Sequence, residues 1–163
     1  MSVVLTGYQF RVMQESDLNA VVQIEPTIYS HPWTRGNFND SLKSRHEAWV
    51  LTQQGEIIGY ALAVVILDEA ELLNISVALP YQKQGLGRMV LMQMIDRAKS
   101  LGATTMFLEV RASNVAAIAL YEHSGFVEVN ARRGYYPVEN GREDAVIMRR
   151  GYNRHDESRR RTT

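Results

Sequence analysis

The residues best suited to chemistry lie in a short stretch, Gln82-Lys83-Gln84-Gly85-Leu86-Gly87-Arg88, between a predicted strand at 71–77 and a long amphipathic helix. The first backbone N–H groups of a helix have no intrahelical partners, and they carry a partial positive charge. Two glycines one residue apart let a ligand approach this backbone closely, and Lys83 and Arg88 flank them. The stretch therefore predicts an anion-binding loop, with a phosphate group as the expected anion.

Three interpretations of this loop differ in the ligand. A phosphate-loop NTPase needs the run G-x-x-x-x-G-K-[ST], which the sequence lacks. For a dinucleotide-binding fold, the sequence supplies two of the three glycines of the fingerprint, Gly85 and Gly87. Glu109 lies about where the acidic residue that binds the ribose is expected. However, Val90 occupies the third glycine position, and residues 78–82 separate the glycines from the strand. The third interpretation is an ordinary glycine-rich helix start.

The elements that must position this loop follow from hydrophobic periodicity and turn residues. Strands are expected at 7–13, 49–52, 57–66, 71–77 and 104–110, with closing strands at 126–129 and 145–148. Helices are expected to begin at Ser16 or Asp17 and stop before Pro26, to begin at Thr34, to follow the glycine loop as far as Gly102, and to run from Ser113 or Asn114 to Gly125. Gly59 indicates a bulge in its strand. This order predicts a mixed α/β sheet and not a strict alternation of parallel units.

The composition favours one soluble domain over residues 1–150, followed by a disordered polar tail at 151–163. No apolar run approaches the roughly 20 residues of a membrane span, and no basic-then-apolar leader pattern begins at Met1. The absence of cysteine is compatible with a cytoplasmic protein and leaves no thiolate for a metal or a nucleophile. The four histidines show no metal-ligand spacing, so no metal is expected. A formal net charge of zero disfavours general nucleic-acid binding.

Several motifs in order and register resemble those of the GCN5-related N-acetyltransferase (GNAT) family. Gln82-x-x-Gly85-x-Gly87 has the family's Q/R-x-x-G-x-G/A spacing, residues 74–77 resemble its acetyl-CoA-facing strand, and residues 108–126 resemble its second half. The resemblance spans about residues 10–148. It implies the GNAT fold, an α/β architecture whose mixed, mostly antiparallel splayed sheet is flanked by helices.

Within the family, the chain is similar to the bacterial enzymes that acetylate the N-terminal alanine of a small-subunit ribosomal protein. The stretches that carry this similarity are His31-Pro32-Trp33, 64–70, 108–114, 132–137 and 141–145. The resemblance implies a protein N-terminus as the acceptor. It implies neither direct nucleic-acid binding nor a membrane partner.

The resemblance also implies how acetyl-CoA, the acetyl donor, is held. The backbone of Ile75, Ser76 and Val77 is expected to pair with the pantetheine arm in the manner of a strand. The pyrophosphate is expected to be wrapped by Lys83, Gln84, Gly85, Leu86, Gly87 and Arg88, and Asn114 is expected to contact the cofactor from a later helix. A helix start flanked by two cations is chemically suited to this task.

By the same resemblance, Glu109 is the general base and Tyr121 the general acid. The alternative for Glu109 is a structural carboxylate paired with Arg111 or another cation, and the alternative for Tyr121 is a tyrosine at the edge of the core. Because the sequence has no cysteine, a cysteinyl acetyl-enzyme is excluded and direct attack in a ternary complex is the simplest mechanism.

The acceptor side is less defined. Trp33, Tyr135 and Tyr136 are candidates for lining a peptide site, although each also suits simple packing. Glu143 and Asp144 form either a solvated turn or an anchor for a substrate amine. Two alternatives to an N-terminal alanine acetyltransferase remain: an enzyme for other N-termini or lysine, and a non-catalytic acyl-CoA-binding module.

Overall fold

The computed structural model describes residues 2–5, 7–139 and 141–152, and the described chain forms two compact units. The first unit is drawn from residues 1–64 and 72–95, and the second from residues 65–71 and 96–163. The described residues include eight strands and four α-helices, and every strand pair whose register is defined is antiparallel. The predicted mixed α/β class with a mostly antiparallel sheet is therefore confirmed.

The first unit is built on strands that follow one another in both sequence and space. They are β1 (Ser2–Leu5), β2 (Tyr8–Val12), β3 (Glu47–Gln53), β4 (Glu56–Ile66) and β5 (Glu69–Val77), in the order β1-β2-β3-β4-β5. The last two residues of β4 and the first three of β5 belong to the second unit. The strands predicted at 49–52 and 57–66 form an antiparallel hairpin. The bulge predicted at Gly59 is also present, because Leu51 pairs with Gly59 whereas Thr52 pairs with Ile57.

Gly59 is required where β4 passes close to β5. A Cβ atom at this position would lie 3.0 Å from the backbone oxygen of Ser76. We therefore expect Gly59→Ala to lower the free energy of unfolding by about 1–3 kcal/mol through overpacking, as measured by urea denaturation. Gly36→Ala is the matched control: its Cβ meets only Thr34 Oγ1, at 3.6 Å. This helical substitution should stabilise by about 0.5–1 kcal/mol. Equal effects of the two substitutions would contradict this explanation.

Two helices of the first unit precede β3, and both begin where they were predicted to begin. α1 (Leu18–Ile28) follows a 3-10 turn (Glu15–Asp17), and α2 (Arg35–Lys43) is capped as expected by Thr34, whose hydroxyl accepts from the amide of Asn37. The prediction that α1 stops before Pro26 is wrong. Pro26 lies in the last turn, where its missing N–H costs one hydrogen bond, and the amide of Tyr29 still bonds to the carbonyl of Glu25 at 3.1 Å.

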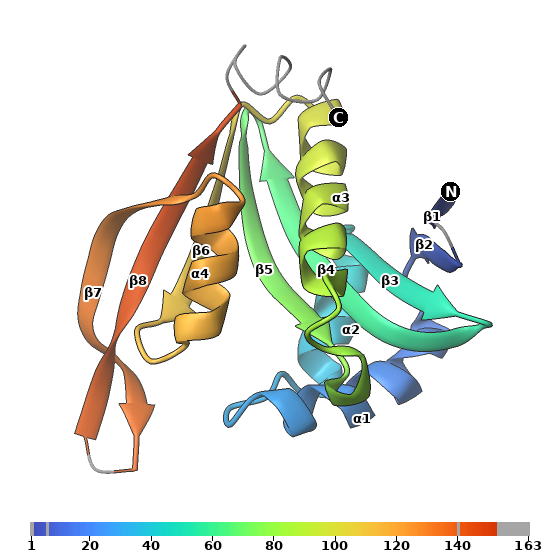
Figure 1. Ribbon diagram of the computed structural model, residues 1–163, viewed down its shortest axis with the longest axis horizontal. Coiled ribbons are helices and arrows are strands. Elements are labelled where there is room, and N and C mark those ends of the chain that lie inside the picture. The colour runs from blue at the N-terminus through green and yellow to red at the C-terminus, as the bar shows by residue number, and fades with distance from the viewer. Residues whose placement is uncertain (1, 6, 140, 153–163) are drawn as a thin grey trace. The chain divides into compact units, whose positions relative to one another are not determined.

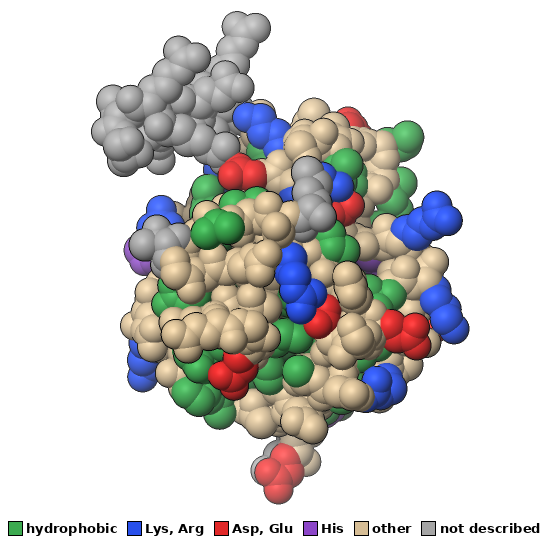
Figure 2. Space-filling model, turned by 90° about the vertical axis from the view of Figure 1, so that its right-hand side faces the viewer, with side chains coloured by type: hydrophobic (Ala, Val, Ile, Leu, Met, Phe, Trp, Pro, Cys, Tyr) green, Lys and Arg blue, Asp and Glu red, His purple; other side chains and the backbone are tan. Residues whose placement is uncertain are grey.

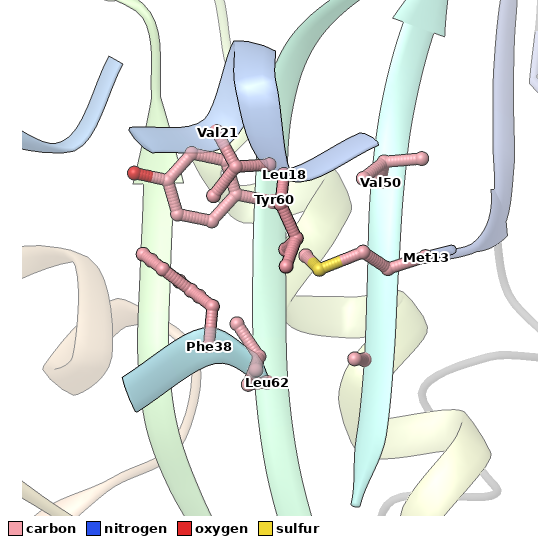
Figure 3. Close-up of a cluster of buried hydrophobic side chains, with 8 residues drawn as sticks. Met13, Leu18, Val21, Phe38, Val50, Tyr60 and Leu62 are labelled. Atoms are coloured by element: carbon pink, nitrogen blue, oxygen red, sulfur yellow. The ribbon is translucent and has the colours of Figure 1, made fainter. Parts of the chain in front are cut away.

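A buried cluster joins α1 and α2 to one face of the sheet (Figure 3). The ring of Phe38 on α2 meets Tyr60 of β4 edge to face, with centroids 5.8 Å apart. The other members are Met13, Leu18, Val21, Ala48, Val50 and Leu62. The helix α3 (Leu86–Ser100) begins on the opposite face (Figure 1). Its predicted apolar stripe is confirmed by the burial of Leu86, Val90, Leu91, Met94, Ile95 and Ala98.

Asp17 connects β2 to the start of α1 through a bidentate pair with Arg11, with both N···O distances 2.8 Å. The guanidinium of Arg11 and the amide of Gln14 lower the pKa of this carboxyl below its usual value. The pair therefore stabilises the fold above the usual aspartate pKa of about 3.9, and the stabilisation disappears as the pH falls through the lowered pKa.

We expect Asp17→Asn to cost about 1–2 kcal/mol of unfolding free energy at pH 7 and much less near pH 2. Urea denaturation at both pH values measures the difference. Asp40→Asn, at an exposed position of α2, is the control and should change little at either pH. A loss of the same size at both pH values for Asp17→Asn would contradict the role of the charge.

The second unit contains β6 (Thr105–Arg111), α4 (Val115–His123), β7 (Val127–Val138) and β8 (Gly141–Gly151), with β8 between β6 and β7. The predicted closing strands at 126–129 and 145–148 were too short. β7 and β8 form a long ribbon (Figure 1) in which β7 is exposed along most of its length. Without a buried face, β7 has no apolar alternation to reveal it.

The end of the second unit also differs from expectation. Gly151, predicted to begin the disordered tail, pairs with Thr105, and the amide of Tyr152 bonds to the carbonyl of Thr104 at 2.9 Å. The rest of the tail, 153–163, lies outside the described residues, so its predicted disorder stays a prediction, as does the single domain. Basic and acidic side chains are interspersed on the face shown in Figure 2, in keeping with the zero net charge. Among the described helices, none is long and apolar enough to cross a membrane.

Candidate active site

The end of β5 directs backbone polar groups of Ile75 and Val77 away from β4. Because the carbonyl of Ser76 lies against Gly59 of β4, the peptide groups on either side of it point the other way. The hydroxyl of Tyr29 donates to the carbonyl of Ile75, and the side-chain amide of Gln82 donates to the carbonyl of Val77 at 2.9 Å. Each of these carbonyl oxygens has a second lone pair, so the segment keeps the hydrogen-bonding capacity that an amide-containing ligand needs.

The glycine loop has the backbone conformation of an anion cradle. After a 3-10 turn (Leu79–Tyr81), Lys83 and Gly85 adopt left-handed conformations with φ values of 63° and 82°. Such alternation turns successive N–H groups toward one point. A Cβ atom on Gly85 would meet nothing within 4 Å, so the space beside the loop is open. These features suit a pyrophosphate.

The start of α3 adds further donors to this loop. The amide of Met89 bonds to the carbonyl of Gly85 at 3.1 Å, so the N–H groups of the three preceding residues lie before the first bond of the helix. Lys83, Gln84 and Arg88 are exposed, whereas the side chain of Leu86 is buried in the core. Leu86 therefore offers a ligand only its backbone.

Trp33 is the one acceptor-site candidate in the first unit. Its ring packs against Phe38 with centroids 5.2 Å apart, and its backbone amide donates to Glu25 Oε2 at 2.9 Å. Sequence reasoning missed Glu25, which is 1% exposed. A signal existed, because Glu25 lies four residues after Val21 and seven after Leu18, on the apolar stripe of α1.

In the second unit, Glu109 lies on the half-buried face of β6. Burial alternates along this strand, because Met106, Leu108 and Val110 are buried and Glu109 is not. Glu109 Oε1 lies 3.3 Å from Arg132 Nε, and the two side chains are 25% and 52% exposed. Such a partly exposed pair is held weakly, so the carboxylate can exchange its partner for a substrate group or a water molecule.

Arg111, on the same face of β6 as Glu109, forms an ion pair with another strand. It bonds to Glu143 Oε1 at 2.9 Å, and Glu143 Oε2 accepts from the amide of Ser113 at 3.2 Å. The hydrogen bond from Arg111 is the main cause that lowers the pKa of Glu143. Asp144 accepts from the amide of Gly134 at 2.9 Å. Glu143 and Asp144 lie in β8 and not in the turn considered for them, and both carboxylates have intramolecular partners.

Two tyrosines of β7 gather around these charges. The guanidinium of Arg111 lies 4.3 Å from the ring centre of Tyr136, and that of Arg132 lies 5.0 Å from the ring centre of Tyr135. Burial, followed by the charge of Glu109, raises the pKa of Tyr136. The second unit therefore brings Glu109, Tyr135 and Tyr136 together. Sequence reasoning missed Arg132 as the ion-pair partner in this cluster, because the residues lie on different strands.

Tyr121 and Asn114 both belong to α4. The ring of Tyr121 is 7% exposed and meets Phe126 edge to face with centroids 5.8 Å apart, while its backbone oxygen accepts from the amide of Phe126. Asn114 caps the helix, as one of the two predicted caps, through its Oδ1 and the amide of Ala117 at 3.2 Å. Its side-chain NH₂ group is the part that remains suited to a ligand. The proposed contact of Asn114 with the cofactor stays a prediction.

Comparison with known proteins defines the class. Residues 18–126 match the acetyltransferase (GNAT) family. The chain is 47% identical over 136 residues to the [ribosomal protein bS18]-alanine N-acetyltransferase of Escherichia coli K12, covering 83% of this chain and 92% of the relative. The corresponding enzyme of Haemophilus influenzae is 38% identical over 137 residues, with coverage of 83% and 93%.

Solved structures agree. The crystal structure of the ribosomal-protein-S18-alanine N-acetyltransferase from E. coli superposes with a TM-score of 0.83 at 44% identity, covering 88% of this chain and 93% of that one. Ard1 from Thermoplasma volcanium, at 22% identity, shares the fold with a TM-score of 0.83, covering 91% and 99%. The chain belongs to the acetyltransferase (GNAT) family. The predicted family and fold are confirmed, and the protein is an acyltransferase.

Proposed function

We propose that this protein transfers the acetyl group of acetyl-CoA to the α-amine of the N-terminal alanine of ribosomal protein bS18. The observation that carries the proposal is the 47% identity, over 83% of the chain, to an enzyme named for that reaction. The site residues support it, because the sequence contains a phosphate-binding loop, a carboxylate and a tyrosine in the family's order. The reaction belongs to the cytoplasm, where ribosomes are found.

Acetyl-CoA is the donor in this proposal. Its pyrophosphate is bound by the backbone of residues 83–88 with the cations of Lys83 and Arg88, and its pantetheine amides pair with Ile75 and Val77. The left-handed backbone at Lys83 and Gly85 and the open space beside Gly85 support the first assignment. The orientation of Ile75 and Val77 away from β4 supports the second.

Glu109 and Tyr121 carry the proton transfers. Glu109 accepts a proton from the acceptor ammonium, directly or through a water molecule, and the free amine attacks the thioester carbon. The resulting C–N bond replaces the C–S bond when the tetrahedral intermediate collapses. Tyr121 donates its proton to the leaving thiolate, which resembles a cysteine thiolate with a pKa of about 8.5. The second proton, lost from the nitrogen as the amide forms, restores the Tyr121 hydroxyl, and Glu109 releases its proton to solvent. The partly exposed carboxylate of Glu109, held by one weak ion pair, supports its role as a base.

An α-amine is the easier acceptor near neutral pH. Its usual pKa of about 7.7–8.0 lies well below the value of about 10.4 for lysine, so its deprotonation costs about 3.5 kcal/mol less. Tyr135 and Tyr136, next to Glu109, are proposed to line the path of the acceptor peptide. Trp33 is proposed as a further residue that contacts the acceptor peptide.

A peptide assay tests this proposal. The purified protein is incubated with acetyl-CoA and the N-terminal peptide of bS18, and CoA release and the acetylated position are recorded. We expect one acetyl group on the alanine α-amine and none when that amine is chemically blocked. Acetylation of an internal lysine in the blocked peptide would identify the lysine alternative. Tight acetyl-CoA binding without transfer to any of a broad panel of peptides would identify a non-catalytic module.

A further inference from the structure

Glu25 accepts hydrogen bonds from three separate parts of the first unit. The amide of Trp33 donates to Oε2 at 2.9 Å, the hydroxyl of Tyr60 donates to Oε1 at 2.8 Å, and the side-chain amide of Asn74 donates to Oε1 at 3.0 Å. The residue is 1% exposed. A carboxylate is costly to bury unless its oxygens are bonded in this way. An apolar residue at this position of α1 would avoid that cost. The presence of a buried carboxylate here therefore points to a role for its hydrogen bonds.

The hydrogen bonds continue along β5. Asn74 Oδ1 lies 2.8 Å from Ser76 Oγ, which lies 3.2 Å from the hydroxyl of Tyr29. Tyr29 in turn donates to the carbonyl of Ile75. Burial and the charge of Glu25 both raise the pKa of Tyr29, so its hydroxyl keeps its proton and remains a donor.

This network ties the segment 29–34, between α1 and α2, to β5 at two places. Tyr29 bonds directly to Ile75, and Trp33 is connected through Glu25 to Asn74. Under the proposed function, this segment contacts the acceptor peptide and β5 contacts acetyl-CoA. The network therefore joins the acceptor side of the first unit to its donor side.

We propose that Glu25 is a positioning residue that holds the segment 29–34 in the conformation that binds the acceptor peptide. β5 is also held by its ladder with β4, whereas the amide of Trp33 depends on the side chain of Glu25. Loss of Glu25 should therefore weaken acceptor binding more than acetyl-CoA binding. This inference rests on the proposed function for its kinetic consequence, but the network itself does not.

The test is Glu25→Gln, which keeps the shape and removes one acceptor. In this variant the side-chain oxygen accepts from Tyr60 and Asn74, as Glu25 Oε1 does. The new NH₂ group then faces the backbone N–H of Trp33, and two donors cannot form a hydrogen bond with each other. We expect amide hydrogen exchange at Trp33, followed by NMR, to become about tenfold faster. We also expect the KM for the bS18 peptide to rise about tenfold, with kcat and the acetyl-CoA dissociation constant each changing less than about threefold.

Two further variants keep the test decisive. Tyr29→Phe removes the hydrogen bonds of the Tyr29 hydroxyl with Ile75 and Ser76 but leaves those of Glu25. It should raise the peptide KM about threefold, which tests the network even if Glu25→Gln does not fold. Glu56→Gln, at the exposed start of β4, should leave all values unchanged. Unchanged exchange at Trp33, or a fall in kcat at constant KM, would overturn the inference. If the wild-type protein acetylates no peptide, the proposed function fails, and the exchange rates still decide whether Glu25 holds Trp33.

Discussion

Glu109→Gln is expected to lower kcat for the bS18 peptide about 100-fold or more, because a neutral amide cannot accept the proton of the acceptor ammonium. Glutamine keeps the size of the side chain and its position on β6, where it faces Ile147 of β8. It gives up only a weak, partly exposed pair with Arg132, so the fold should lose less than about 1 kcal/mol. The acetyl-CoA dissociation constant should change less than about twofold. Steady-state kinetics and calorimetric titration measure the two quantities.

The control for this prediction is Glu128→Gln. Glu128 is an exposed carboxylate of β7 in the same unit, opposite Met148 of β8. Its replacement changes the net charge equally and should leave kcat unaltered. A normal kcat for Glu109→Gln would leave Glu109 as a purely structural carboxylate, the alternative that its pairing with Arg132 also allows.

Tyr121→Phe is expected to lower kcat about 10-fold to 100-fold, because the leaving thiolate loses its proton donor. The ring is retained, so its edge-to-face contact with Phe126 and the burial of the residue should persist. The melting temperature should therefore remain close to that of the wild type, and the defect should appear in kcat and not in the peptide KM.

Tyr8→Phe serves as the control for hydroxyl removal at a half-buried tyrosine of β2, and its kcat should equal that of the wild type. If Tyr121→Phe also turns over normally, water or another group protonates the thiolate. A large fall in melting temperature would instead show that the hydroxyl of Tyr121 stabilises α4.

Features encoded by local periodicity and turn chemistry could be predicted from the sequence. The apolar stripe of α3 repeats at helical spacing, and Thr34 precedes a helix with Asn37 three residues later. The bulge at Gly59 was also predictable, since a glycine inside a β-rich segment lacks the side chain that a strand packs. The predictions of these features were correct because a few adjacent residues determine each of them.

Features that depend on distant partners could not be predicted. β7 lacks a buried face, so only its pairing with β8 makes it a strand. The continuation of α1 through Pro26 has a local cause instead, because a proline near the end of a helix removes only one backbone hydrogen bond. The burial of Glu25 requires Trp33, Tyr60 and Asn74 to converge from three segments.

The candidate site shows the same division. The glycine loop was proposed from its motif and Glu109 from the family resemblance, and their roles stay predictions. The pairing of Glu109 with Arg132, and of Arg111 with Glu143, depends on the register of the three-stranded β6-β8-β7 sheet. The sequence left Arg111 or another cation open as the partner of Glu109, and spacing along one strand could not name Arg132, which belongs to β7. Contacts between strands that are distant in the sequence therefore determine which charged side chains pair.

The most direct test of the central proposal is mass spectrometry of the N-terminal peptide of bS18 from cells with and without this protein. The proposal predicts that the alanine α-amine is acetylated when the protein is present, free when it is deleted, and acetylated again when the wild-type gene is restored. Restoration with Glu109→Gln should leave most of the α-amine free. An N-terminus that remains acetylated in the deletion strain would contradict the proposed acceptor.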